Sequence, residues 1–503
     1  MRFVAMTTLT SEGLPSVMRT FYGRSHRRRR RPGQPPRRLE WVTVMHVGHG
    51  IEAVLQRGMC VGCGGCALAA GPVRVALNSR GVYQADLSEL TPAQRANASR
   101  VCPFSDDAAD EDVLAGEQFA SLPRHPALGR HLGAYAGRSA RPGRLESSSG
   151  GLTSLLLEEL LRRGLVDGVI HVGRSDGDAL FAYRVSRSAQ DVRAVKGSVY
   201  SATSFAEVLA AVRGDGRRYA FVGVPCFVTA VRLLAREDPA LAGQVPYLVG
   251  LVCGHLKSGF FAESLSWQAG VKPAALTSID FRVKNPHRRA YSYDYRVTGG
   301  GKSRDRRIDS TLDGNWAYGA FQPEACNFCD DVFAETADIT FGDAWVAPYL
   351  DDWRGTNIVV TRSRELDDLV RELRDVGQIE LDELTPERVA LSQAGGLRHR
   401  RDGLRVRLAD DRAAGLSVPR KRVEPGYEAL TEQRIALVRQ RRVLSRISLE
   451  AFAEARRQGR WAAYARPMRR GIRRYRAIEA ASTPWVVRQV SRWKARARKL
   501  IGR

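Results

Sequence analysis

Cysteines in the first part of the chain carry its strongest chemical signal. Cys60, Cys63 and Cys66 are separated by two residues each, and Cys102 follows later, directly before Pro103. Thiolates at this spacing can hold a 4Fe–4S cluster, whose irons take cysteine ligands. A structural zinc ion is the alternative, but three cysteines at two-residue intervals favour the iron–sulfur cluster.

One position departs from the cysteine run of bacterial ferredoxins. In that run a further cysteine follows after three intervening residues, and at the corresponding place after Cys66 this chain has Ala70. Cys102 is therefore the predicted fourth ligand. The glycines that would let the backbone approach the sulfurs are Gly62, Gly64 and Gly65.

The other four cysteines are spread more widely. Cys226 follows a predicted strand at 219–223, Cys253 ends the next one, and Cys326 and Cys329 form a close pair. The carboxyl ends of parallel strands share one edge of a sheet, where ligands bind in open α/β folds. We therefore predict that these four thiolates converge on a second 4Fe–4S cluster. A zinc ion held by the same four cysteines is the next interpretation, and four unrelated buried thiols are the third.

Two loops of small residues are candidates for binding a phosphate or a flavin. Residues 147–151, Ser-Ser-Ser-Gly-Gly, precede a predicted helix, and helix N-termini present unpaired N–H groups to anions. Lys196, Ser198 and Tyr200 place a cation, a hydroxyl and an aromatic ring in a second loop. Ordinary solvated loops are the alternative for both.

Alternating helix and strand signals surround these loops. Strands are predicted at 167–173, 219–223, 245–253, 338–345 and 356–363, and helices at 151–164, 204–216, 226–237 and 258–268. Strands separated by helices of this length predict an α/β fold with a mainly parallel sheet. Residues 277–312 predict a strand-rich insertion, and the chain beyond 420 predicts Arg-rich helices broken by Pro467 and Pro484.

The composition divides the chain into four parts. Residues 1–44 are rich in Arg and Pro and are predicted to be a disordered leader, with Met45 as an alternative start. Residues 45–134 predict a small ferredoxin-like iron–sulfur unit. Residues 135–400 predict an α/β domain that contains the second cysteine set and both small-residue loops, and residues 401–503 a basic helical tail.

The order of the motifs resembles that of one known family. The segments SSSGGLTSLLLEELLRRGLVDGVI, KGSVYSA, GVPC, GLVCG, CNFCDD and ADITFGDAW are similar to those of the beta subunits of coenzyme F420-reducing hydrogenase and dehydrogenase, over roughly residues 55–365. Relatives include a reductase of 7-hydroxymethyl chlorophyll. The resemblance implies an FAD enzyme with iron–sulfur clusters, in which residues 135–400 form the FAD and iron–sulfur catalytic domain. It also implies that the second cysteine set ligates the cluster next to the flavin. The flavin-lining residues it implies are Ser149, Gly150, Gly151, Thr153, Lys196, Ser198 and Tyr200.

The net charge of +25 is concentrated at the two ends of the chain. Residues 1–44 carry +8 and residues 420–503 carry +18, which leaves −1 for the body. The neutral body and the absence of clustered aromatic residues argue against specific nucleic-acid binding. The tail mixes Arg with apolar residues, which predicts an amphipathic helix on an anionic membrane surface. A helical tail packed on the body is the alternative. The apolar residues concerned are Leu430, Ile435, Leu437, Val438, Val443, Ile447, Trp461, Trp485 and Trp493.

Membrane and export signals are missing from the sequence. No run approaches the ~18 apolar residues that a spanning helix needs, and the leader lacks the apolar region of a signal peptide. These observations predict a cytoplasmic protein, with peripheral contact at the inner membrane face through the tail.

These features together predict an FAD- and 4Fe–4S-dependent oxidoreductase that moves electrons between its clusters and a small hydride acceptor or donor, such as coenzyme F420. A protein such as ferredoxin is a candidate electron donor. The alternative is a non-catalytic electron-transfer subunit that docks a partner oxidoreductase.

No catalytic residue is identified. We expect His255 and His287 to be structural or exposed, and Asp330, Asp331 and Asp343 to orient cluster or flavin groups, or, for Asp343, to cap a turn.

Overall fold

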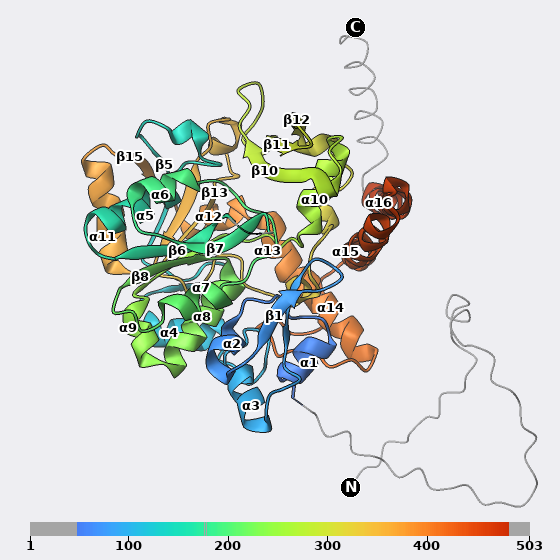
Figure 1. Cartoon of the computed structure of the whole chain (residues 1–503), viewed down its shortest axis with the longest axis horizontal. Helices are drawn as coiled ribbons and strands as arrows, with labels where there is room; N and C mark the ends of the chain where they lie inside the picture. The colour runs from blue at the N-terminus through green and yellow to red at the C-terminus, as the bar shows by residue number, and fades with distance from the viewer. Residues whose placement is uncertain (1–47, 176, 178, 482–503) are drawn as a thin grey trace, which may run out of the picture. The chain divides into compact units, whose positions relative to one another are not determined.

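A mixed sheet of eight strands forms the centre of the fold (Figure 1). The computed structural model describes residues 48–481 except 176 and 178, and these residues belong to one compact unit. The strands lie in the order β15 (Ile379–Glu383), β5 (Gly133–Ser139), β14 (Asn357–Thr361), β13 (Ile339–Asp343), β9 (Tyr247–Leu251), β8 (Tyr219–Gly223), β6 (Gly168–Arg174) and β7 (Phe181–Ser186). The four strands β13, β9, β8 and β6 are parallel to one another.

The predicted mainly parallel sheet is confirmed for these four strands and is wrong for the flanks. β14, β5, β15 and β7 each join the sheet antiparallel to their neighbours. β6 and β7 form a hairpin, and β14 returns beside β13 with no α-helix between them. Antiparallel neighbours need no crossover helix, so the alternation of helix and strand that predicts parallel pairing is absent there.

Alternate residues along the strands face two different layers. Tyr247 and Val249 of β9 pack with α5 (Leu152–Arg162) and α11 (Arg364–Asp375), whereas Leu248 faces α8 (Pro225–Glu237) on the other side. This period of two is the geometry of a strand covered on both faces. α5 and α8 coincide closely with the helices predicted at 151–164 and 226–237.

The N-terminal cysteines lie in a small unit of short elements. These are α1 (Ile51–Gln56), α2 (Gly65–Ala70), β1 (Arg74–Leu77), β2 (Tyr83–Asp86), α3 (Pro92–Arg100) and α4 (Glu111–Gln118). Val61 and Val101 of this unit share a buried apolar cluster with Phe227 and Val231 of α8. The unit is therefore packed on the same face of the sheet as α8. The predicted leader, residues 1–44, lies outside the described residues.

The strand-rich insertion predicted at 277–312 is confirmed. β10 (Leu276–Val283), β11 (Asp294–Gly299) and β12 (Lys302–Arg307) form a separate antiparallel sheet, which follows α10 (Phe260–Gln268). Ile279, Phe281 and Val297 point into an apolar cluster shared with α10, whereas every residue of β12 is exposed.

Five helices follow β15 in the described chain. They are α12 (Pro386–Ser392), α13 (Ala394–Arg400), α14 (Asp402–Ala413), α15 (Glu432–Gln458) and α16 (Trp461–Ala481). α15 and α16 form an antiparallel pair, drawn in red in Figure 1. The break predicted at Pro467 is wrong, because α16 continues through this residue. Burial of Tyr464 and Met468 on either side of it holds the helix together, although an interior proline costs ~3 kcal/mol. Pro484 lies outside the described residues.

The described part of the basic tail is built into the core. Phe452 of α15 and Tyr464 of α16 pack with Phe260 and Phe321 in one apolar cluster. Of the apolar residues predicted to rest on a membrane, Val438 is buried, Leu437, Ile447 and Trp461 pack partly buried against this cluster, and Val443 is exposed. Trp485 and Trp493 lie outside the described residues. Among the described residues of this set, most of the apolar surface thus faces the protein.

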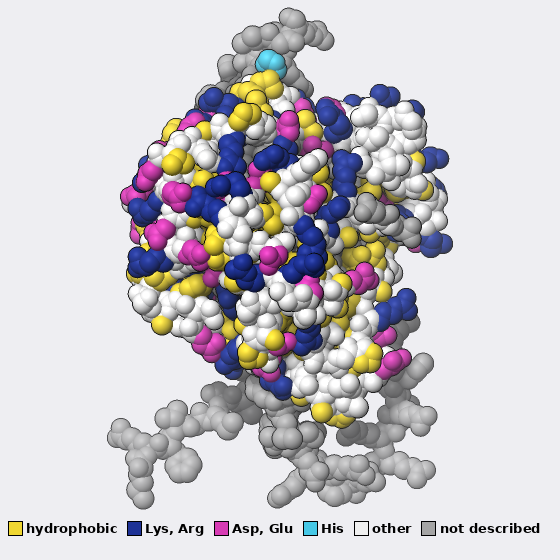
Figure 2. All heavy atoms as spheres, turned by 60° about the vertical axis from the view of Figure 1, so that its left-hand side comes forward, with side chains coloured by type: hydrophobic (Ala, Val, Ile, Leu, Met, Phe, Trp, Pro, Cys, Tyr) yellow, Lys and Arg dark blue, Asp and Glu magenta, His cyan; other side chains and the backbone are white. Residues whose placement is uncertain are grey.

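The surface mixes charges of both signs. Figure 2 shows Lys and Arg side chains interspersed with Asp and Glu over the face that it displays. Ion pairs on the described surface include Arg296–Asp305 and Arg163–Glu372. No helix within residues 48–481 has both the length and the apolar character needed to cross a membrane.

Candidate functional site

The first cysteine group comes together as the spacing predicts. Cys60 and Cys63 lie in the loop before α2, Cys66 lies within α2, and Cys102 follows α3. The four thiols are near neighbours, because charges on Cys60, Cys63 and Cys66 each raise the pKa of Cys102. Burial is the largest cause of the raised pKa of all four, and that of Cys63 reaches about 12. At neutral pH these thiols are protonated unless a metal displaces the proton.

Two glycines shape the loop around these sulfurs. The backbone N–H groups of Gly62 and Ala85 each donate to the Cys60 Sγ at 3.4 Å. Gly62 has φ +62°, and a Cβ there would lie 2.5 Å from the carbonyl carbon of Tyr83. Gly64 has φ +102°, and a Cβ would meet Ala206 at 2.6 Å. The predicted close approach of backbone to sulfur therefore depends on residues without side chains.

The second group gathers at the carboxyl edge of the sheet. Cys226 opens α8 directly after β8, and Cys253 follows β9, so the two neighbouring strands present both. The pair Cys326 and Cys329 lies in the short turn before β13. Charges on these three thiols each raise the pKa of Cys226, after the larger effect of its burial. Cys326 Sγ accepts the backbone N–H of Leu256 at 3.3 Å.

The described cysteines are neither paired in disulfides nor arranged around a single metal ion. All eight cysteines are free of disulfides. Among the described residues no three or more His, Cys, Asp or Glu side chains are arranged to hold a single metal ion. A zinc ion requires its thiolates to meet at one point ~2.3 Å away. In a 4Fe–4S cluster each thiolate binds a different iron, so neighbouring sulfurs need not converge so tightly.

The two groups are adjacent to each other. The pKa of Cys226 is raised most by burial and then by the other three thiols of its own group. A charge on Cys63 of the first group raises it further. Tyr183 lies beside both, since charges on Cys226 and Cys63 raise the pKa of its buried phenol. Its ring stacks on Phe221 and Phe227 at centroid distances of 5.4 and 5.9 Å. Tyr183 thus lies near a cysteine of each group.

The two small-residue loops also meet. The backbone N–H of Ser198 donates to Ser148 Oγ at 2.7 Å, and Lys196 forms an ion pair with Glu146. The first loop is tightly packed at Gly150, where a Cβ would lie 2.7 Å from the carbonyl oxygen of Gly137. Gly151 is the N-cap of α5 with φ +81°, and Thr153 lies in the first turn of that helix. The loops predicted to line a flavin thus form one surface at the carboxyl edge.

Two cations beside these loops were not predicted from the sequence. Lys284 Nζ donates to the carbonyl oxygen of Ser149 at 2.8 Å, and burial lowers its pKa to about 8. Arg282 donates to Asp343 at 2.6 Å, which gives Asp343 an ion-pair partner at the end of β13. Alternation at the end of β10 gives a weak signal for Arg282, and Lys284 follows that strand. Only the packing of this segment beside the loops brings both side chains there.

Aromatic residues complete this surface. Tyr200 contacts Phe281 and Trp316 edge-on, at centroid distances of 5.4 and 5.1 Å. Trp316 in turn stands over the ammonium of Lys257 at 4.7 Å. Lys257 is 2% exposed, donates to the carbonyl oxygen of Ala320 at 2.6 Å, and has its pKa lowered to about 7 by burial. Sequence reasoning also missed Trp316 and Lys257.

The two histidines differ in environment. His255 is buried against Trp316 at a centroid distance of 4.5 Å, and burial lowers its pKa well below the usual value. Its Nε2 has no hydrogen-bond partner within the described residues, and its Nδ1 lies 3.3 Å from Arg441. His287 is exposed. Asp330 forms an ion pair with Arg422, and Asp331 accepts the backbone N–H groups of Phe333 and Glu335.

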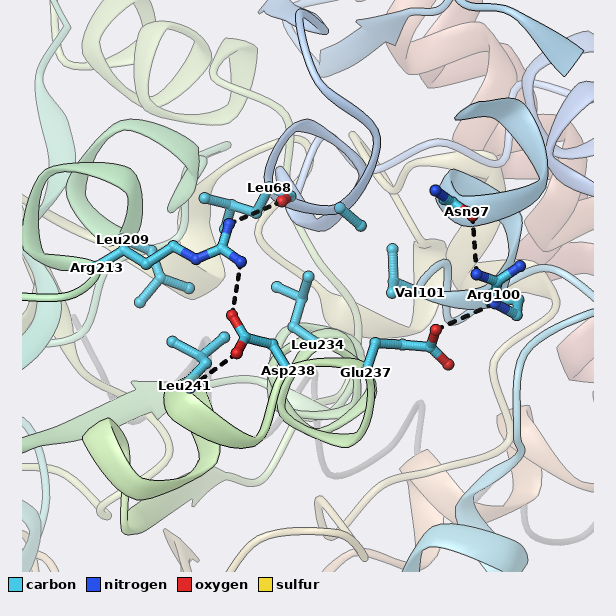
Figure 3. A pocket seen from close by; sticks show the side chains of 11 residues that line it. Leu68, Asn97, Arg100, Val101, Leu209, Arg213, Leu234, Glu237, Asp238 and Leu241 are labelled. Carbon is cyan, nitrogen blue, oxygen red and sulfur yellow. Dashed lines mark hydrogen bonds and ion pairs between the residues drawn. The ribbon is translucent and has the colours of Figure 1, made fainter. Parts of the chain in front are cut away.

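A cavity of about 210 Å³ opens beside the first cysteine group (Figure 3). α2 contributes Leu68, α3 contributes Arg100, and the ion pairs Arg100–Glu237 and Arg213–Asp238 lie on its wall. None of the predicted flavin residues lines it. Its volume is below the ~300 Å³ at which sites for larger organic ligands begin, so we do not assign it to FAD.

Two family models match the segments that build the second cysteine group and the two small-residue loops. The first cysteine group, at residues 60–102, lies outside the matched residues. Residues 134–210 match the model for the N-terminal part of the coenzyme F420 hydrogenase/dehydrogenase beta subunit, and residues 216–387 match the model for its C-terminal part. The chain belongs to this family. The resemblance of the motifs is therefore confirmed, and the family is one of oxidoreductase subunits that transfer electrons.

Individual relatives are distant. The F subunit of the F420H2 dehydrogenase of Methanosarcina mazei is 24% identical over 339 residues, which cover 65% of this chain and 86% of the relative. A chain of the F420-reducing [NiFe] hydrogenase complex from Methanosarcina barkeri is 19% identical, with a TM-score of 0.46, covering 61% of this chain and all of that chain.

Proposed function

We propose that this member of the family is an iron–sulfur flavoprotein oxidoreductase. Each cysteine group would hold a 4Fe–4S cluster, and residues 147–153 with 196–200 would hold FAD. The single observation that carries the proposal is the sorting of all eight cysteines into two adjacent groups of four. Clusters of this type carry single electrons, and FAD exchanges one or two, so this set of cofactors connects one-electron carriers with hydride transfer.

The flavin assignment is supported by the chemistry of the loop surface. Gly150 packs the loop against β5, and Gly151 is the N-cap of α5, where the helix dipole favours anions such as phosphate. Lys284 adds a cation beside the loop, and Lys196 lies next to it in an ion pair with Glu146. Tyr200 and Trp316 provide aromatic faces of the kind that pack against a flat ring system.

The substrate we propose is a small hydride carrier such as coenzyme F420. The name of the Methanosarcina mazei relative, a subunit of an F420H2 dehydrogenase, supports this choice. The same name supports a partner protein, for which a ferredoxin-type electron carrier in the cytoplasm is our candidate. An electron-transfer subunit that serves a partner oxidoreductase is the second candidate function, since the relative is itself a subunit.

Cofactor analysis tests the first part of the proposal. Full-length protein purified under anaerobic conditions should contain ~8 iron atoms and an equal amount of acid-labile sulfide per chain, together with about one equivalent of FAD. Stoichiometric zinc without iron would contradict the cluster assignment, and iron without flavin would contradict the loop assignment.

Turnover by the isolated chain separates the two candidate functions. Oxidation of reduced F420 with a viologen acceptor, compared with NADH as control substrate, would support the enzyme. A protein that holds both clusters and FAD but turns over reduced F420 only with a partner subunit would support the electron-transfer role.

A further inference from the structure

A buried arginine from outside the family-matched region reaches the second cysteine group. Arg400 is the last residue of α13, and the family match ends at residue 387. Its side chain is 1% exposed, among the largest fully buried side chains in residues 48–481. An arginine keeps its charge when buried, so its surroundings must compensate that charge.

The guanidinium is directed at Cys253. Arg400 Nη2 donates to the carbonyl oxygens of Cys253 and Gly254 at 3.2 and 3.3 Å, and it approaches Cys253 Sγ at 3.6 Å. Nε and Nη1 have no partner within the described residues. A buried guanidinium with two unused donors is incompletely satisfied by the protein alone, which points to a missing acceptor beside it.

Three sulfurs of the group face this cation. Cys329, Cys253 and Cys326 favour the charged form of Arg400, and Arg400 in turn lowers the pKa of each of these thiols against the larger effect of burial. Asp331 lies on the same side. The charge partners of Arg400 are therefore mainly the sulfurs that would ligate the second cluster.

We propose that Arg400 is a positioning residue that raises the reduction potential of the second 4Fe–4S cluster. The proposal rests on the proposed function. Reduction adds one negative charge to the cluster, and a fixed positive charge in a buried site favours that state. Net charge and hydrogen bonds to the sulfurs are established determinants of cluster potential. Arg400 supplies both, with a hydrogen bond to a ligand sulfur and a charge facing three.

The test compares three variants of the full-length protein purified anaerobically. Arg400→Gln removes the charge but keeps an N–H donor, and Arg400→Lys keeps the charge. Arg398→Gln is the matched control, because Arg398 is exposed on the same helix. Redox titration monitored by EPR gives the midpoint potential of each cluster, and the signal lost in Cys329→Ser identifies the second cluster. Iron content is measured for every sample.

We expect Arg400→Gln to lower the one-electron reduction equilibrium constant of the second cluster at least tenfold, a shift of about 59 mV. Arg400→Lys should restore most of the shift, and Arg398→Gln should leave the potential unchanged. An unchanged potential in Arg400→Gln with all iron retained would overturn the inference. Loss of the cluster from both Arg400 variants would also overturn it, because Arg400 would then serve assembly. Wild-type protein without iron would instead refute the proposed function.

Discussion

Cys63 of the first cysteine group lies close enough to Cys226 of the second for a charge on one thiol to raise the pKa of the other. These residues are far apart in the sequence, one in the loop before α2 and one at the start of α8. The N-terminal cysteine group therefore lies near the carboxyl end of β8, where the second group begins.

Substitution of a single cysteine in either group should remove half of the bound iron. Cys63→Ser and Cys329→Ser should each reduce iron from about eight to about four atoms per chain, because each group holds one cluster. The measurement is iron and sulfide analysis after anaerobic purification. Each variant is the control for the other, and loss of all iron in both would show that the groups do not bind metal independently.

Gly151→Leu should lower flavin content. Gly151 has φ +81°, and a Cβ there would lie 3.2 Å from Ser147 Oγ, so a large side chain both strains the N-cap and fills the loop surface. Gly164→Leu is the control, since Gly164 has φ +65° at the other end of α5 with nothing within 4 Å of a Cβ. Bound FAD is measured by fluorescence after release. Equal occupancy in the two folded variants would refute the loop assignment.

The stability of the protein should depend on the charge state of Lys257. Burial lowers its pKa to about 7, against 10.5 for an ordinary lysine, so above pH 7 the unfolded chain binds more protons than the folded one at this site. The free energy of unfolding should therefore rise with pH between about 7 and 10, by at most about 1.4 kcal/mol per pH unit from this group.

Replacement by an uncharged residue tests this dependence. Lys257→Met should remove that contribution, so that chemical unfolding at pH 7 and pH 9 differs less in the variant than in the wild type. The difference between the two proteins isolates Lys257 from the thiols that titrate in the same range. Identical slopes would show that Lys257 keeps its charge in the folded state.

Arg422→Gln should be strongly destabilising. Arg422 forms ion pairs with Asp330, Glu335 and Asp112, and its side chain is largely buried. Removal of one partner from a buried ionic network leaves uncompensated carboxylates and typically costs about 3–5 kcal/mol. Thermal unfolding measures the loss, with the exposed Arg469→Gln as control. A fall in Tm no greater than that of the control would show that the carboxylates are otherwise compensated.

The sequence by itself determined the groups of residues and much of the secondary structure. The two-residue spacing of Cys60, Cys63 and Cys66 is local, and the chain must bring these three thiols near one another whatever the fold does elsewhere. The bounds of β8 and α8 were predicted almost to the residue. The apolar run that indicates the strand and the helical period that indicates the helix are both local patterns of consecutive residues. The motif order also indicated the family.

Only the tertiary structure decided which distant residues meet. Sheet pairing is a long-range property, so the antiparallel flanks and the strands β5, β7 and β15 had no reliable local signal. Lys284 reaches Ser149, and Arg400 reaches Cys253, only because β10 and α13 pack beside the sheet edge. Composition marked residues 420–503 as a basic tail, but burial of Phe452 and Tyr464 makes α15 and α16 part of the core. An amphipathic pattern shows that a helix has an apolar face, and the rest of the fold determines what covers it.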